Sequence, residues 1–145
     1  MFSNSLSWLP WALASAAFAA LTAIFAKIGV ANVNSDLATL IRTAVILCVL
    51  AAMVGFTGQW QAPAEIPRLT WIFLFLSGLA TGASWLCYFR ALKLGDAARV
   101  APIDKLSVVL VAVFGVVFLG EKLSGINWVG VALIACGALL VALKG

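Results

Sequence analysis

The sequence predicts an all-α integral membrane protein with five transmembrane helices, which form a single domain over residues 1–145. Two observations lead to this fold class: a strongly apolar composition and the division of the apolar residues into five long runs. Hydrophobic residues make up 65% of the chain, charged residues make up 10%, and the mean hydropathy is +1.16. Because soluble domains are about 45–50% apolar and about 25% charged, lipid must cover much of this surface.

Each apolar run has the length of one membrane crossing. About 20 helical residues, at about 1.5 Å each, cross the hydrocarbon core of a bilayer. Strands of a membrane barrel would be about 10 residues long and would alternate in polarity. The runs are therefore predicted to be helices, at about Trp8–Val30, Asp36–Phe56, Leu69–Leu92, Ala98–Leu119 and Gly125–Leu143.

The polar segments between the runs contain residues that start and stop helices. Ser35 or Asp36 can cap the second helix by accepting hydrogen bonds from its free N–H groups. Gly95 suits the left-handed position after a helix, and Asp96 suits the N-cap of the next one. The longest connection, residues 57–68, contains two prolines.

The basic residues predict the orientation of the chain. Arg68 and Lys122 fall on the side of the N-terminus, whereas seven basic residues fall on the other side or at the helix ends nearest to it. These seven are Lys27, Arg42, Arg90, Lys93, Arg99, Lys105 and Lys144. Since Lys and Arg concentrate on the cytoplasmic side, we expect the N-terminus outside and the C-terminus inside. Trp8, Trp11, Trp60, Trp71 and Trp128 all fall on the predicted outer side, as an aromatic belt would.

Asp104 and Lys105 place an acid and a base inside the fourth apolar run. Charges in the membrane interior are costly and often mark functional sites. Arg42, about two turns into the second helix from the same side, is the natural partner of Asp104, which lies about two turns into the fourth. Two interpretations stay open: a structural ion pair between helices, or a polar cavity where Asp104 holds a proton or a cationic group. Pro102 favours the cavity, because it leaves a carbonyl without its N–H partner.

Aromatic residues lie at a similar depth on the third helix. Trp85, Tyr88 and Phe89 would wall a pocket for an amphipathic or cationic solute, or else pack against lipid and other helices. The predicted substrate pathway comprises Arg42, Trp85, Tyr88, Asp104 and Lys105.

Several classes of function are disfavoured by what the sequence lacks. Histidine is absent, which removes the commonest metal ligand and the usual general base. The sequence contains no HExxH, GxSxG or phosphate-binding glycine motif. We therefore expect no enzyme activity, no cofactor and no metal site. The net charge of +4 comes from few residues at the ends of apolar runs, so we expect no nucleic-acid binding.

Three segments of the second half carry a resemblance to a known family. The segment ALKLGDAARVAPI at 91–103, FLGEKLS at 118–124 and WVGVALIACGALLV at 128–141 resemble an EamA-type domain of the drug/metabolite transporter superfamily. The Gly120–Glu121 turn is the most specific part, and the resemblance covers essentially the whole chain. It implies a transporter that exports a small metabolite or drug-like solute, in the bacterial inner membrane.

The same resemblance implies a dimer. Typical members carry two such domains in opposite orientations, and transporter sites form between repeats near the midplane. A chain with one domain is similar to the half-length branch, so we expect a homodimer or an inverted partner chain. The charge bias favours one orientation and hence a parallel pair, and the sequence leaves this open.

One departure supports a rival interpretation. The four-helix multidrug exporters of the superfamily keep a glutamate in their first helix, whereas the first run here contains no acid. Asp104 is the candidate replacement for a proton-coupling residue. The alternative function is a non-transporting membrane subunit that scaffolds or pairs with another membrane protein.

Overall fold

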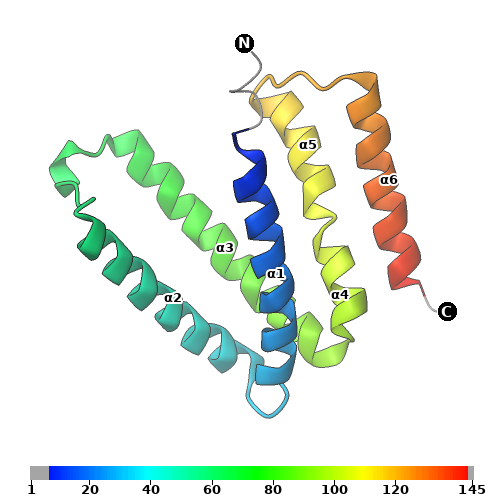
Figure 1. Ribbon diagram of the computed structural model, residues 1–145, viewed down its shortest axis with the longest axis horizontal. Helices are drawn as coiled ribbons and strands as arrows, with labels where there is room; N and C mark the ends of the chain where they lie inside the picture. The colour runs from blue at the N-terminus through cyan, green and yellow to red at the C-terminus, as the bar shows by residue number, and fades with distance from the viewer. Residues whose placement is uncertain (1–6, 144–145) are drawn as a thin grey trace. The chain divides into compact units, whose positions relative to one another are not determined.

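The computed structural model describes residues 7–143, and every regular element in that range is a helix (Figure 1). The elements are α1 (Leu9–Gly29), α2 (Ser35–Thr57), the short 3₁₀ helix η1 (Pro63–Glu65), α3 (Arg68–Leu94), α4 (Ala97–Asp104), α5 (Ser107–Phe118) and α6 (Gly125–Ala142). Five segments are long and apolar enough to span a membrane, with α4 and α5 together forming one segment of 22 residues. The predicted fold class is confirmed, and the orientation stays a prediction.

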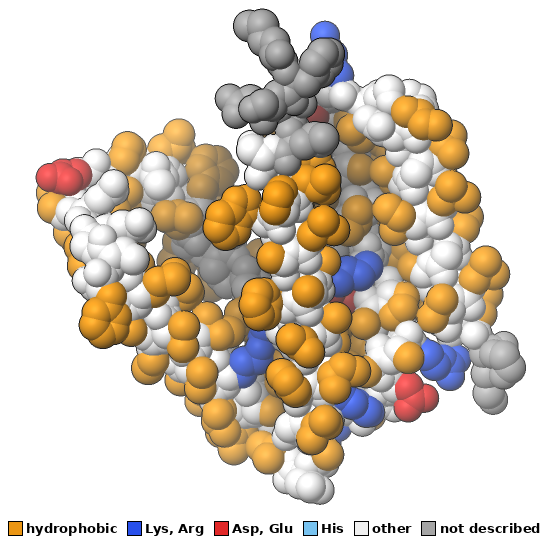
Figure 2. Space-filling model, in the orientation of Figure 1, with side chains coloured by type: hydrophobic (Ala, Val, Ile, Leu, Met, Phe, Trp, Pro, Cys, Tyr) orange, Lys and Arg blue, Asp and Glu red, His pale blue; other side chains and the backbone are white. Residues whose placement is uncertain are grey.

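The large apolar side chains of these helices are mostly exposed on the surface of the chain. Phe56 is 92% exposed, Trp11 80% and Phe118 76%. Figure 2 shows hydrophobic side chains covering much of the visible surface, with basic side chains at only a few places. Such a surface is compatible with lipid and incompatible with water, so the chain is a multi-pass membrane protein.

Contacts divide the described residues into two compact units. One unit is residues 28–93, with α2, η1 and α3; the other consists of the described parts of residues 1–27 and 94–145, with α4, α5, α6 and most of α1. The prediction of a single domain over residues 1–145 stays a prediction.

In the unit of residues 28–93, α2 begins and ends with capped turns. The side chain of Asn34 accepts hydrogen bonds from the N–H groups of Asp36 at 2.8 Å and Leu37 at 3.3 Å. The N-cap is therefore Asn34, and the prediction of Ser35 or Asp36 was wrong by one or two residues. At the other end Gly58 has φ +65°, a conformation that costs a glycine little.

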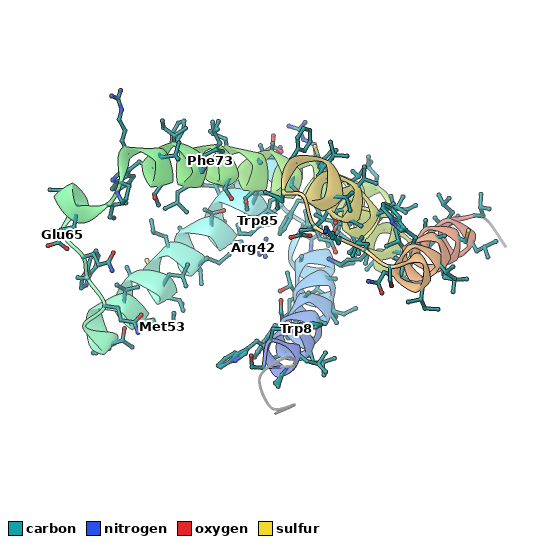
Figure 3. All side chains as sticks on the ribbon, turned by 90° about the horizontal axis from the view of Figure 1, so that it is seen from above. Trp8, Arg42, Met53, Glu65, Phe73 and Trp85 are labelled. Atoms are coloured by element: carbon teal, nitrogen blue, oxygen red, sulfur yellow. The ribbon has the colours of Figure 1, made fainter. Side chains whose placement is uncertain are left out.

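Two basic side chains of α3 make three hydrogen bonds to the start of α2 and the turn before it. The guanidinium of Arg90 donates to both carboxylate oxygens of Asp36, at 3.1 and 2.8 Å. Lys93 Nζ donates to the carbonyl oxygen of Val33 at 2.6 Å. From this joined end the two helices diverge toward η1, as Figure 3 shows.

In the other unit, α6 packs along α4 and α5. Arg99 Nη2 donates to the carbonyl oxygen of Ala142 at 2.9 Å, and Lys27 Nζ donates to the carbonyl oxygen of Gly95 at 2.8 Å. Both acceptors lie at or just after a helix C-terminus, where carbonyl groups lack intrahelical partners and the helix dipole favours a cation. These basic side chains therefore satisfy backbone groups as well as carrying charge.

The predicted fourth helix, 98–119, is broken. α4 ends at Asp104 and α5 begins at Ser107. Across the break, Leu106 N donates to Ile103 O and Val108 N donates to Lys105 O, each at 3.0 Å and each spanning three residues where an α-helix spans four. Pro102 lies inside α4, where it has no N–H to donate to the carbonyl of Ala98, and the three-residue bonds begin in the turn that follows it. The predicted fourth spanning segment is therefore confirmed, and a short 3₁₀ turn at Lys105 and Leu106 interrupts its α-helical hydrogen bonds.

The turn after α5 folds back onto the helix. The N–H groups of Leu119 and Glu121 both donate to the carbonyl oxygen of Gly115, at 3.1 and 3.0 Å, and Gly120 has φ +69°. The Glu121 carboxylate occupies space that a side chain at residue 115 would need, since its Oε2 lies 2.6 Å from an ideal Cβ position there. The Gly120–Glu121 turn thus packs against the last turn of α5 and is bonded to it.

Candidate substrate-binding site

Arg42 is stacked against aromatic rings of α3. Its guanidinium carbon lies 4.2 Å from the ring centroid of Trp85 and 5.6 Å from that of Phe89. Both distances are within about 6 Å, the range in which a cation is attracted to the face of an aromatic ring. Trp85 and Phe89 are four residues apart and therefore share a helix face. Figure 3 shows Arg42 and Trp85 in the space between α2 and α3.

Tyr88 belongs to the same cluster. Its ring meets that of Phe89 edge to face, with centroids 6.5 Å apart, an arrangement that aromatic rings favour. The structure thus brings together Arg42, Trp85 and Tyr88, three of the five residues in the predicted pathway. Phe89 was absent from that pathway, although its spacing of four from Trp85 was the signal that it shares the face.

The guanidinium of Arg42 lies beside the deeper of the two rings of α3. Arg42 lies about 10 Å along α2 from the end that the Asp36–Arg90 pair joins to α3. Measured from the same end, Phe89 lies at about 8 Å and Trp85 at about 14 Å along α3. The guanidinium is closer to Trp85, the deeper ring, than to Phe89. Snorkelling would bring the guanidinium toward the shallower ring.

The N–H edges of this guanidinium are open to an acceptor. Among the described residues of its own unit, 28–93, Arg42 makes no hydrogen bond or ion pair, because the carboxylate of Asp36 is held by Arg90 and Glu65 lies in η1. Ring faces attract the flat side of a guanidinium and leave its five N–H donors in the plane. An arginine costs about 2.5–3.5 kcal/mol at the centre of a spanning helix and less toward its ends, and a cation–π contact offsets about 0.5–2 kcal/mol. An acceptor on the N–H edges would offset the rest.

Asp104 and Lys105 form a second polar feature, in the other unit. Lys105 Nζ lies 3.2 Å from Asp104 Oδ2, and the Asp104 side chain is 33% exposed. Lys105 lies just after the end of α4, and its ammonium reaches the carboxylate of the preceding residue. Arg42 and Asp104 belong to different units, so the predicted pair between them stays a prediction.

The break places a short 3₁₀ turn at membrane depth, in which Lys105 and Leu106 keep right-handed helical backbone. Asp104 is the eighth residue of α4, about 12 Å along the axis from its start. Non-helical backbone inside a membrane is tolerated where protein buries it or where it lines a water-filled cavity. In transporters, discontinuous helices of this kind form the substrate and ion sites near the midplane.

No metal centre accompanies these polar features. Across residues 7–143, no three side chains of His, Cys, Asp or Glu gather closely enough to hold a metal ion. The polar chemistry of this part of the chain therefore rests on a guanidinium, an ammonium, a carboxylate and aromatic rings.

Comparisons with known proteins agree on one family. The chain matches the EamA-like transporter family over residues 6–143, a range that includes all five spanning segments. It is similar to a protein of Sinorhizobium sp. named "Uncharacterized transporter in cobO 3'region", with 76% identity over 138 residues, which are 95% of this chain and 98% of that protein. No solved structure matches the chain.

Proposed function

Since the chain belongs to the EamA-like transporter family, we propose that it exports a small metabolite or drug-like solute as a dimer, by alternating access. The broader function, membrane transport, is that of the family, and the five spanning segments fit it. Export, dimerisation and the bacterial inner membrane are parts of the proposal, and catalysis is not.

The observation that carries this proposal is the Arg42–Trp85 stack inside a spanning segment. A charged group with unused donors, held between helices on aromatic rings, is costly for a purely structural subunit and useful for a solute site. The broken span at Asp104 and Lys105 supports it, because a discontinuous helix exposes polar backbone where a solute passes.

The dimer follows from the geometry of such sites. Transporter sites of this kind form at the interface between repeats, and the described chain contributes one set of five spans. The chain covers 98% of the similar protein from Sinorhizobium sp., so that protein also has one set. A second copy, parallel or inverted, would supply the other half, as would an inverted partner chain.

Solute flux in liposomes tests the proposal. Purified protein is reconstituted, and release of labelled organic anions, cations and neutral solutes is followed. We expect flux of at least one class, reduced at least about tenfold by Arg42→Gln. Arg68→Gln, which removes an arginine at the start of α3, is the matched control and should leave flux unchanged. Correctly inserted wild-type protein that moves no solute would contradict transport and favour the scaffold function.

A further inference from the structure

The aromatic faces beside Arg42 are already occupied by a cation. One of the two expectations for Trp85, Tyr88 and Phe89 was a pocket for an amphipathic or cationic solute, but the guanidinium of Arg42 lies over the rings of Trp85 and Phe89 at 4.2 and 5.6 Å. A second cation at the same rings would meet charge repulsion from the first. The cluster is therefore poorly suited to the solute class that its aromatic residues alone would indicate.

The fixed charge around this cluster is positive. Within the unit of residues 28–93, the charged side chains at the joined end of α2 and α3 are Arg42, Arg90 and Lys93 against one carboxylate, Asp36. Asp36 is paired with Arg90 in a bidentate contact, and Lys93 donates to the Val33 carbonyl. Of these three cations, Arg42 alone makes no hydrogen bond or ion pair to a described residue of the unit, so its N–H edges are open.

The geometry suits a ligand that has two parts. A carboxylate accepts two parallel N–H bonds from the edge of a guanidinium, which is the strongest and most directional contact that arginine makes. The helices α2 and α3 diverge from the end that the Asp36–Arg90 pair joins (Figure 3). The apolar body of the ligand would lie between them, along Trp85 and their apolar residues. A neutral ligand would gain the apolar contact without the paired bonds, and an amine would lack these bonds and also be repelled by the guanidinium.

We infer that the solute is an organic anion whose carboxylate binds the open edge of Arg42 while its apolar body lies against Trp85. This inference rests on the proposed transport function and names the substrate class of the same site. Arg42 is the group that selects charge, and Trp85 both holds the guanidinium and contacts the ligand.

Binding by full-length protein in lipid nanodiscs tests the inference with matched probes. The carboxylates butyrate, phenylacetate and indole-3-acetate are compared with their amides and with amines of the same apolar body. We expect at least one carboxylate to bind saturably, and at least about tenfold more tightly than its amide and amine, which corresponds to about 1.4 kcal/mol. Arg42→Gln should abolish this preference, and Arg68→Gln should keep it.

The conservative variant keeps the test valid if Arg42→Gln does not fold. Arg42→Lys retains the positive charge but loses the planar pair of donors, so we expect carboxylate binding between that of wild type and that of a neutral residue. Amines that bind as tightly as carboxylates, a preference that survives both substitutions, or no binding by any of the three carboxylates would overturn the inference.

Flux measurements separate this inference from the proposed function. Flux of amines or neutral solutes without flux or binding of carboxylates would overturn the organic-anion inference and leave transport standing. Carboxylate binding that depends on Arg42, without flux of any solute, would support the anion site and contradict transport.

Discussion

Replacing Pro102 with alanine should restore a continuous α-helix between α4 and α5. Proline inside a helix costs about 3 kcal/mol relative to alanine, through the lost N–H and the clash with the preceding turn. Alanine at 102 would donate to the carbonyl oxygen of Ala98 and allow four-residue bonds through residues 105 and 106. The three-residue bonds at Ile103 and Lys105 would then be replaced. A change of about 3 kcal/mol shifts the balance between broken and continuous helix by about 100-fold.

Hydrogen exchange read by mass spectrometry measures this change directly. In protein with Pro102→Ala, we expect the amides of residues 105–109 to exchange at least about tenfold more slowly, because a continuous ladder opens less often. Pro67→Ala, at the residue just before α3, is the control and should leave these amides unchanged. Solute flux should fall in the same variant, since a straight span no longer presents polar backbone at the site.

Two results would refute this reasoning. Unchanged exchange at residues 105–109 would mean that Pro102 is not the cause of the break. Slower exchange with full solute flux would mean that the break takes no part in transport.

Three further predictions concern single side chains. Trp85→Leu removes the ring nearer to the Arg42 guanidinium. Carboxylate binding should weaken about 2- to 30-fold, which is the range of a cation–π contact. Isothermal titration calorimetry measures this loss, with Trp128→Leu on α6 as the control. Asp104→Asn removes the carboxylate that pairs with Lys105, and should reduce flux while membrane insertion stays intact; full flux would remove Asp104 from the mechanism. Gly115→Ala places a Cβ 2.6 Å from Glu121 Oε2, whereas the Cβ of Gly78→Ala meets nothing within 4 Å. Because the carboxylate can move aside at modest cost, the free energy of unfolding should fall by about 1 kcal/mol in Gly115→Ala. Thermal unfolding measures this loss, and Gly78→Ala should show none.

The bias of basic residues toward one side has a structural cause as well as a topological one. Lys27, Lys93 and Arg99 each donate to a backbone carbonyl within their own unit, at Gly95, Val33 and Ala142 respectively. Such contacts stabilise the fold in either orientation of the chain. These three of the seven residues that predict a cytoplasmic C-terminus therefore serve a second purpose, and Lys144 lies outside the described residues. Fewer of the seven basic residues therefore serve only to set the orientation of the chain in the membrane.

The candidate site was only partly predictable from the sequence. Depth along the helices grouped Arg42 with Trp85 and Tyr88, because residue position alone sets how far a side chain lies from a helix end. Which atoms touch was not predictable. The contact of Asp104 with Lys105, the next residue in the chain, did not follow from depth, and the pair of Asp104 with Arg42 stays a prediction.

By itself the sequence determined that this protein crosses a membrane five times, because the length and apolar content of each run leave no other stable arrangement in lipid. The family also follows from the sequence, through segments such as the Gly120–Glu121 turn. Only the tertiary structure decided that Arg42 lies on Trp85 and that Arg90 takes Asp36, since these contacts join residues more than 40 positions apart. The apolar composition of each helix determines that lipid surrounds it. The packing of segments far apart in the sequence determines which charged side chains remain open to a solute.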